Sequence, residues 1–308
     1  MARKSKTKKA SSKTPPKRAA KAKKWSPKES GKPRRPSALP GTRVVVVSTI
    51  TMPQTLRTAF EGGYNANGGT LAVDFVDDLG YDRTTLRTKF QELNNIGAIA
   101  LVVTVGGLII FKVANNQSTK KFISLVGGTP DNNPSNAFLG GVSLQSFKMN
   151  RLRLGHLDDL GFQKNEVGLY QNPNSDMVDK EERHWKGGEI RKASGNNDPG
   201  TFANDLSLFS SGTKAIVISA DPFFQKEKDK LVDAANAVAA GPSGKYFCYP
   251  LQDYGAAARP PLPGKATLHG PALKDPYRLL GICASLAINT GVKMNPTFLM
   301  LDEEVNDL

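Results

Sequence analysis

Two successive series of buried strands and helices constrain the fold of this chain more than any other feature of its sequence. The first series opens with RVVVVSTI (43–50), a continuous β-branched run typical of a strand covered on both faces. Pro53 suits the first turn of a helix that extends to about Tyr64, and NANGG, whose residues tolerate a left-handed backbone, ends it. Strands and helices then alternate, which predicts βαβ units in a parallel sheet.

The remaining segments repeat this pattern and then restart it. In the first series, further strands are predicted at 71–78, 98–105, 120–128 and 138–144, with a helix over 82–95 that Asp82 can cap. In the second series, strands are predicted at 165–173, 214–224 and 245–251, with helices over 146–162, 225–240 and 276–291 and a capped helix within 198–211 of the polar region 174–211. The pattern predicts an α/β protein with two doubly wound parallel-sheet lobes, in which ligands bind beyond the carboxyl ends of the strands.

The N-terminal residues 1–41 differ in composition from the rest of the chain. Fifteen Lys and Arg and one acid lie within residues 1–40, so this stretch accounts for the whole formal net charge of +14. Such a Lys-, Ala-, Ser- and Pro-rich stretch cannot bury enough apolar surface to fold, and we expect a disordered tail. The tail favours salt-sensitive binding to DNA, RNA or another polyanion, while a solubilising extension stays open. The side chains expected to contact a polyanion are Lys4, Lys8, Lys9, Lys17, Arg18, Lys23, Lys24, Arg34 and Arg35.

No feature of the sequence predicts a membrane span, a metal site or a cofactor. The longest apolar run, 96–111, is shorter than the roughly 18 residues that a span needs and is broken by Gly106 and Gly107. The first 41 residues lack the apolar core of a secretory signal, so we expect a cytoplasmic protein. Cys248 and Cys283 form no metal-binding spacing, and the histidines lie far apart in sequence.

Sequence motifs of common catalytic sites are also lacking. The segment GNNDPGT (195–201) has the glycine spacing of a phosphate-binding loop but not its lysine, which favours a turn before a helix. The chain contains no GxGxxG after a strand, no GxSxG and no HExxH. We therefore expect a protein without enzymatic activity.

The segment IVISADPFF (216–224) is the strand end that most invites a functional interpretation. Because it ends a buried strand, Asp221 and the two phenylalanines are expected at a cleft, where Phe223 and Phe224 could stack on a flat ligand and Asp221 could receive an amine or hydroxyl. Two structural alternatives stay open. Asp221 can cap the following helix, and the phenylalanines can belong to the core.

Four stretches of the chain resemble a known family. They are FLGGVSLQSFKMNRLRLGHLDDLG (138–161), VGLYQNPNS (167–175), IVISADPFFQKEKDKLVDAA (216–235) and LHGPALKDPYRLLGICASLA (268–287). From about Arg43 onward, the chain resembles substrate-binding proteins of bacterial ABC importers with the type I periplasmic-binding fold, in particular the tryptophan and tyrosine group. In the last stretch, His269 stands where the family has an aromatic residue.

The resemblance implies two lobes with a ligand between them and a chain that crosses from lobe to lobe about three times. By analogy, lobe I comprises residues 42–142 and 266–292, and lobe II comprises 143–265 and 293–308. The resemblance places the ligand-binding residues at strand ends and near the crossover. They are Ser48, Thr49, Thr104, Gly106, Thr129, Asp131, Asn172, Asp221, Phe223, Phe224, Tyr254 and His269.

These observations lead to one main hypothesis about function. The chain is expected to be a non-enzymatic protein that binds a small amino-acid-like or aromatic molecule between its lobes, with a basic tail that binds nucleic acid or another polyanion. The alternative is a structural or interaction protein that keeps the fold, has lost the ligand and assembles through its tail. Fold alone does not establish ligand binding, so the residues of the cleft must decide between these two hypotheses.

Overall fold

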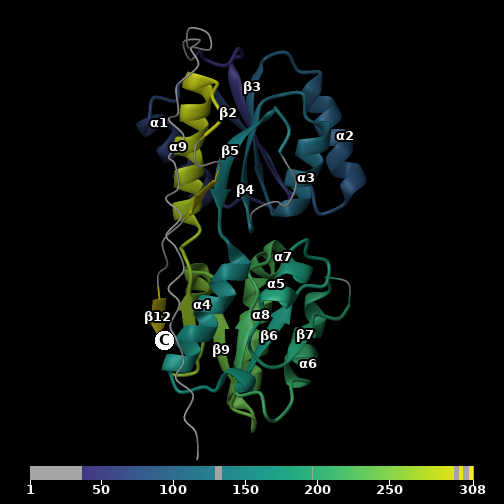
Figure 1. Ribbon diagram of the computed structural model, residues 1–308, viewed down its shortest axis with the longest axis vertical. Coiled ribbons are helices and arrows are strands. Elements are labelled where there is room, and N and C mark those ends of the chain that lie inside the picture. The colour runs from purple at the N-terminus through teal and green to yellow at the C-terminus, as the bar shows by residue number, and fades with distance from the viewer. Residues whose placement is uncertain (1–36, 129–133, 196, 295–297, 301–304, 308) are drawn as a thin grey trace, which may run out of the picture. The chain divides into compact units, whose positions relative to one another are not determined.

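The structure is a computed structural model, and it describes residues 37–128, 134–195, 197–294, 298–300 and 305–307 (Figure 1). Residues Pro36–Leu308 form a unit of their own, separate from Met1–Arg35. Most of the predicted tail, 1–41, therefore lies outside the described residues, together with every side chain expected to contact a polyanion. The two predicted lobes lie in the unit that begins at Pro36.

The first sheet contains six parallel strands in the order β11-β5-β4-β3-β1-β2. Its strands are β1 (Arg43–Ser48), β2 (Ala72–Val76), β3 (Ile99–Val105), β4 (Phe122–Val126), β5 (Phe138–Ser143) and β11 (Phe298–Met300). The helices that connect and cover them are α1 (Gln54–Ala66), α2 (Arg83–Asn94), α3 (Leu108–Gln117) and α9 (Lys274–Thr290). The strand order confirms the doubly wound α/β arrangement that the alternating pattern predicts.

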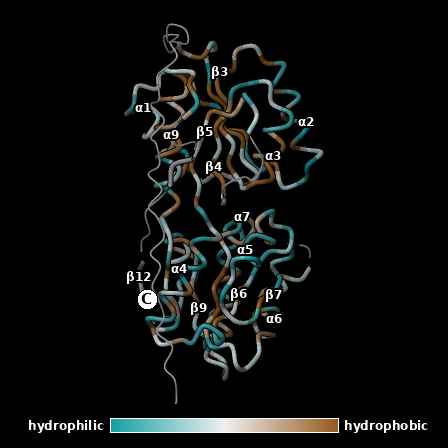
Figure 2. Tube along the Cα trace, viewed as in Figure 1, coloured by the Kyte–Doolittle hydropathy of each residue, from teal (hydrophilic) through white to brown (hydrophobic). Residues whose placement is uncertain are grey.

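Alternate residues of β1 face opposite helical layers. Val44 and Val46 pack in the core cluster that contains Phe60 of α1 and Leu280 of α9. Val45 and Val47 pack in a second cluster with Phe90 of α2 and with α3. Since both faces are covered, the strand needs apolar side chains at successive positions, which explains the continuous valine run. Figures 1 and 2 show these two layers on either side of the hydrophobic central strands.

The second sheet contains six strands in the order β12-β10-β9-β8-β6-β7, of which β12 is antiparallel to β10. Its strands are β6 (Val167–Gln171), β7 (Ile190–Lys192), β8 (Ala215–Ile218), β9 (Tyr246–Tyr249), β10 (Ala266–His269) and β12 (Val305–Asp307). Its helices are α4 (Ser146–Asp159), α5 (Val178–His184), α6 (Phe202–Ser207), α7 (Pro222–Lys226) and α8 (Lys228–Ala240). The polar region 174–211, where the sequence left most elements open, thus contributes α5, β7 and α6.

The second sheet is also covered on both faces. Val217 of β8 packs with Leu154 and Leu157 of α4. Ile216 and Ile218 face the opposite layer, where they share a core cluster with side chains of α6, α7 and α8. The two sheets with their helices are the two lobes of an α/β fold, as the sequence predicted. No helix within the described residues combines the length and apolar character needed to cross a membrane.

The chain passes between the two sheets at three points within the described elements. It leaves the first sheet after β5, returns after β10 to form α9, and after β11 reaches the second sheet again as β12. Two boundaries differ from the implied lobes. The strand 266–269 was expected in lobe I but pairs with β9 in the second sheet, and 298–300 was expected in lobe II but pairs with β5 in the first. The strand β10 extends the second sheet beyond β9 and is itself paired with β12, whereas β11 forms the edge of the first sheet beside β5.

Helices α1 and α9 cross at two glycines. A Cβ atom on Gly63 would lie 2.0 Å from the carbonyl oxygen of Arg278, and one on Gly281 would lie 2.1 Å from that of Phe60. The absence of these two side chains therefore lets the backbones approach closely. This contact fixes α9, which begins at the last crossover before β11, against the first lobe.

Candidate ligand-binding cleft

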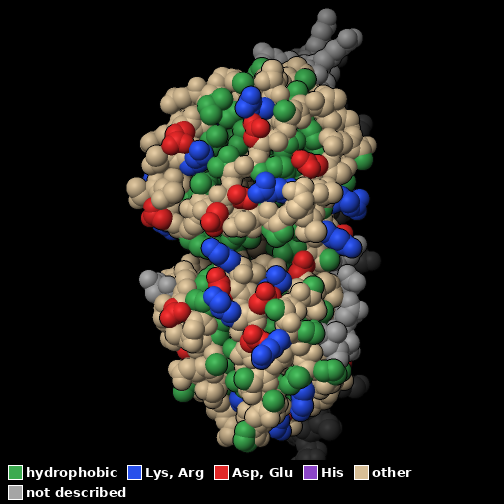
Figure 3. Space-filling view, turned by 180° about the vertical axis from the view of Figure 1, so that it is seen from behind, with side chains coloured by type: hydrophobic (Ala, Val, Ile, Leu, Met, Phe, Trp, Pro, Cys, Tyr) green, Lys and Arg blue, Asp and Glu red, His purple; other side chains and the backbone are tan. Residues whose placement is uncertain are grey.

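A cavity of about 560 Å³ lies at the carboxyl ends of strands from both sheets. The first lobe lines it with residues after β3 and β4, among them Gly106 and Gly127, and the second with residues after β6 and β8, among them Asn172 and Asp221. This is the position that the doubly wound pattern predicts for a ligand site, and the volume falls within the range of small-molecule pockets. Figure 3 shows a hollow between the lobes with charged side chains on both rims.

Asp221 both caps a helix and lines the cavity. It precedes α7, and its Oδ1 accepts hydrogen bonds from the backbone N–H of Phe223 (2.8 Å) and the side-chain amide of Asn172 (2.9 Å). The residue is only 6% exposed, although it borders the cavity. Burial raises the pKa of the Asp221 carboxyl, an effect partly offset by its hydrogen bonds to Asn172, Phe223, Ser175 and Phe224. Asp221 therefore has both expected roles: it caps α7, and it lines the cavity.

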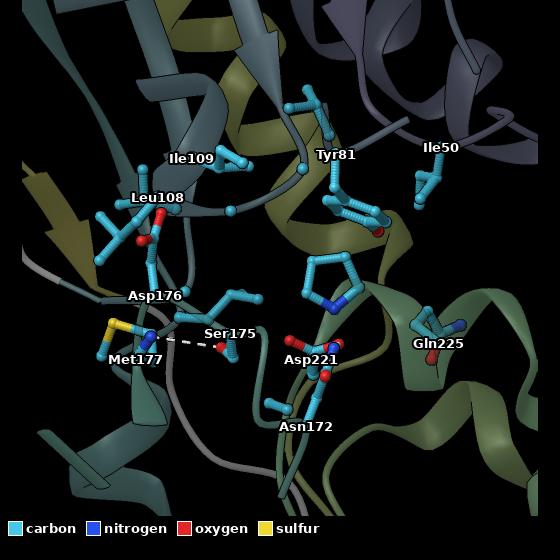
Figure 4. Close-up of a pocket in the computed structure, with 18 of the residues that line it drawn as sticks. Ile50, Tyr81, Leu108, Ile109, Asn172, Ser175, Asp176, Met177, Asp221 and Gln225 are labelled. Carbon is cyan, nitrogen blue, oxygen red and sulfur yellow. Dashed lines mark hydrogen bonds between the residues drawn. The ribbon is translucent and has the colours of Figure 1, made fainter. Parts of the chain in front are cut away.

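Asn172 connects Asp221 to the loop that follows β6. Its side-chain oxygen accepts a hydrogen bond from the backbone N–H of Asn174 (3.0 Å), while its amide donates to Asp221. The hydroxyl of Ser175 accepts from the backbone N–H of Met177 (3.2 Å), and the same loop adds Asp176 to the lining. Figure 4 shows these loop residues beside Asp221 on the second-lobe side of the cavity. The loop is thus folded around the acid.

The first lobe contributes a glycine pair after β3. Gly106 has a φ of +119° and Gly107 a φ of +92°, both in the region that favours glycine. A Cβ on Gly106 would lie 1.8 Å from Oγ1 of Thr49, whose hydroxyl donates to the Gly106 carbonyl oxygen (3.3 Å). Thr49 itself is buried behind Gly106 and does not line the cavity. The glycines let the chain turn tightly from β3 into α3 at the cavity wall.

Phe223 and Phe224 belong to the core, which was the alternative interpretation of the sequence. Phe224 is fully buried and stacks on Tyr170 of β6, with ring centroids 5.1 Å apart and an angle of 8° between the ring planes. Both rings also contact Phe202 of α6, and neither lines the cavity. The expected aromatic wall at these two positions is therefore wrong in this structure. Once the helix begins at Pro222, the side chains of the next two residues turn inward.

The other expected residues lie at or behind the strand ends without lining the cavity. The hydroxyl of Ser48 accepts from the N–H of Ile50, and that of Thr104 donates to Ser124 (2.7 Å). Tyr254 is fully buried and stacks on Tyr249 at 5.0 Å, and His269 is 3% exposed. These four residues are buried and do not belong to the cavity lining. Thr129 and Asp131 lie outside the described residues.

Two tyrosines that the sequence did not single out line the cavity. Tyr81 follows β2, and Tyr277 lies in the first turns of α9. Burial and the nearby carboxylate of Asp221 raise the pKa of the Tyr81 hydroxyl, which also lies close to Thr49. Figure 4 shows Tyr81 projecting from the first lobe toward the side where Asp221 lies. The polar run VDDLGYD (76–82) after the second strand was the available signal for Tyr81.

A buried polar network lies at the carboxyl ends of the second sheet. Arg153 of α4, which is 1% exposed, donates to the carbonyl oxygens of Pro250 (3.0 Å) and His269 (2.9 Å) and to Asn150 (2.6 Å). The Asn150 amide donates to Glu181 of α5 (2.9 Å), which also accepts from Gln171 and Ser219. Burial raises the pKa of Glu181, against the effect of these hydrogen bonds. The network ties together the ends of β6, β8, β9 and β10.

Ion pairs connect the two lobes beside the cavity. Asp176 of the second lobe pairs with Lys112 of α3 (3.0 Å) and Arg83 of α2 (3.6 Å). Lys226 of α7 pairs with Asp78, which lies after β2, at 3.5 Å. Within the part of the chain that the structure describes, no three His, Cys, Asp or Glu side chains gather as a metal site.

Comparison with known proteins adds fold-level information. No protein-family model matches the chain, and no curated protein matches it in sequence. Several solved structures match in fold. An ABC domain in complex with L-Trp from Streptococcus pneumonia has a TM-score of 0.63 at 12% identity, over 85% of this chain and 91% of that one.

Two further solved structures come from other proteins with the same fold. The 5-methylthioribose transporter solute binding protein from Thermotoga lettingae, in complex with 5-methylthioribose, has a TM-score of 0.60 at 13% identity, over 89% of this chain and 88% of that one. The trehalose repressor from Escherichia coli has a TM-score of 0.61 at 12% identity, over 86% of this chain and 100% of that one. Together they confirm a type I periplasmic-binding-protein-like fold.

Proposed function

We propose that this protein binds a small amino-acid-like or aromatic molecule between its lobes and catalyses no reaction. The observation that carries this proposal is the cavity at the strand ends of both sheets, into which a buried acid and two tyrosines converge. An apolar lining with a few converging polar groups is what small-molecule sites require. The solute-binding proteins of the same fold support the proposal by analogy.

The test is a search for ligand in the full-length protein. Native mass spectrometry of the purified chain should reveal a bound small molecule that is lost on denaturation. Calorimetry against amino acids and aromatic acids should show heat, and the same compounds should raise the melting temperature, because a ligand that binds only the folded state stabilises it. If no compound of a broad panel gives heat or raises the melting temperature, the result would favour a protein that keeps the fold for assembly alone.

We also propose that residues 1–40 bind DNA, RNA or another polyanion. The support is the concentration of the whole net charge of +14 in this stretch. DNA retention by the full chain should fall steeply between low and moderate salt, because binding releases condensed counterions. A chain without residues 1–40 should lose retention. Equal retention by this shortened chain would place the DNA contact elsewhere.

A further inference from the structure

The charged residues of the cavity lining are all acidic. Among its described residues the lining contains three acids, Asp82, Asp176 and Asp221, and no Lys, Arg or His. Asp82 is exposed and caps α2 through the backbone N–H of Thr85 (2.7 Å). Asp176 is paired with two cations of the first lobe. Asp221 is thus the buried acid of the lining, and the groups that hydrogen-bond to it are neutral.

We propose that the cleft takes a ligand with a protonated amine and that Asp221 releases a proton when this amine binds. The inference rests on the proposed function and narrows its ligand to a cation. It concerns a single exchange: the carboxyl group of Asp221 gives its proton to solvent, and the ammonium group keeps its own protons and pairs with the resulting carboxylate.

The groups that hydrogen-bond to Asp221 bring no positive charge to it. Oδ1 accepts from the Asn172 amide and the Phe223 N–H, and neither donor brings a full charge. A buried carboxylate is costly without a cation, and a buried carboxylic acid is less so. Burial therefore favours the protonated form in the empty cleft, consistent with the raised pKa of the group. An ammonium group in the cavity would favour the ionised carboxylate of Asp221 instead, because it supplies the opposite charge.

The other titratable groups near Asp221 are not cations. Burial, and to a smaller extent the charge of Asp221, raise the pKa of Tyr81 in the loop after β2, of Tyr254 in the 3₁₀ turn Gln252–Ala256 and of Glu181 in α5. Tyrosines and a glutamic acid bring no positive charge to the Asp221 carboxyl. Tyr277 of α9 lines the same cavity.

The cations of neighbouring elements are occupied elsewhere. Lys226, at the other end of α7, pairs with Asp78 at the rim (3.5 Å). Arg153 of α4 directs three N–H groups at two carbonyl oxygens and Asn150. Through Asn150 it is linked to the carboxyl group of Glu181, which does not line the cavity. The positive charge missing from the Asp221 site is therefore expected from the ligand.

The proposed exchange determines how affinity depends on pH. In the protein without ligand, burial raises the pKa of the Asp221 carboxyl, and a bound ammonium group lowers it. At a pH between the pKa of the free protein and that of the complex, binding therefore releases a proton. Affinity for the amine should therefore rise with pH through this window and level off above it. At much higher pH the amine itself loses its charge, near ~10 for an alkylamine, and affinity should fall again.

Calorimetry on the full-length protein tests this with matched probes. Tryptamine and tyramine carry the amine, tryptophol and tyrosol replace it with a hydroxyl, and L-tryptophan and L-tyrosine add a carboxylate. Each is titrated in two buffers of different ionisation enthalpy, since the difference in heat counts the protons released. The amines should bind about tenfold or more tighter than the alcohols, as expected for a charge-assisted hydrogen bond, and should release protons.

Asp221→Asn is the decisive variant because asparagine is also a good helix N-cap and keeps the shape of the side chain. It should lose the preference for amines over alcohols and the proton release. Asp229→Asn makes the same chemical change at an exposed position of α8 and should alter neither. Circular dichroism and the melting temperature show that both variants fold.

The outcomes separate the inference from the proposed function. Alcohols that bind as tightly as amines, or amine binding without proton release, would overturn the inference and leave a small-molecule cleft. Proton release that persists in Asp221→Asn would also overturn it. If no probe of the series binds, the aromatic or amino-acid-like ligand of the proposed function fails, and the inference that rests on it fails as well.

Discussion

At the scale of single residues, the cavity wall depends on backbone that only glycine adopts easily. Gly106 and Gly107 turn the chain from β3 into α3 with positive φ angles, and Gly106 lies directly against Thr49. Gly107 comes close to the second lobe, because a Cβ there would lie 3.5 Å from Cγ of Pro222. The turn before α3 and the first residue of α7 thus border the same cavity.

Gly106→Ala should therefore destabilise the fold by about 1–3 kcal/mol, because it adds backbone strain and a clash with Thr49. Urea unfolding of the full-length protein measures the change. Gly97→Ala is the matched control, since a Cβ there meets nothing within 4 Å. A stability of Gly106→Ala equal to that of the control would contradict the described turn.

Whether a site residue could be predicted depends on its distance from a strand. Asn172, Asp221 and Gly106 follow buried strands and line the cavity. The parallel-sheet rule alone pointed to Asp221, whereas Asn172 and Gly106 were implied by the family resemblance. Phe223 and Phe224 also follow a buried strand in the sequence, but they lie in the short helix α7, where their side chains face the core. Tyr277 reaches the cavity only because α9 docks on α1, which no local pattern shows.

At the scale of elements, the crossing of α1 and α9 holds the returning chain on the first lobe. Neighbouring glycines of α1 have opposite surroundings. A Cβ on Gly63 would meet the Arg278 backbone at 2.0 Å, whereas one on Gly62 would meet nothing within 4 Å. Helix propensity favours alanine at both positions, and packing opposes it at only one.

Gly62→Ala should stabilise the protein by up to about 1 kcal/mol, because alanine loses less conformational entropy in a helix. Gly63→Ala should destabilise it by about 1–3 kcal/mol, because the helices must move apart. The two melting temperatures measured side by side should shift in opposite directions. Similar shifts for both variants would show that the helices do not cross at Gly63.

The elements themselves could largely be predicted from the sequence. Continuous β-branched runs such as the one in β1 identify strands buried on both faces, and alternation with helices then fixes the fold class. Within the region 174–211, the capped helix predicted in 198–211 is present as the Asp198-capped turn Pro199–Thr201 and α6, whereas α5 and β7 were not predicted, because they have only seven and three residues. Elements this short show no full period of apolar residues and depend on tertiary contacts.

At the scale of the whole molecule, ion pairs between the lobes border the cavity. Lys112 comes from the first lobe and Asp176 from the second, and their side chains are 45% and 17% exposed. Exposed pairs of this kind contribute little to stability, about 0.2–1 kcal/mol. Their position matters more than their strength, because they act only where the lobes meet.

A double-mutant cycle with Lys112→Met and Asp176→Asn should therefore give a coupling free energy of about 0.2–1 kcal/mol that disappears at high salt. The coupling should also appear in the affinity for a cleft ligand. The pair Lys230 and Glu227 lies within the second lobe and serves as the control. The coupling of this control pair should leave ligand affinity unchanged, and an equal effect of both pairs would contradict a specific effect of the inter-lobe pair on ligand binding.

The last strands, β11 and β12, have a consequence for the order in which the protein is made. β11 completes the first sheet beside β5, and β12 completes the second beside β10. A nascent chain that has not yet reached Phe298 therefore lacks one edge strand in each lobe, and β5 and β10 are still unpaired on the side that β11 and β12 later cover. Biosynthesis cannot finish one lobe before starting the other, so both lobes become complete only when the ribosome has added these two strands.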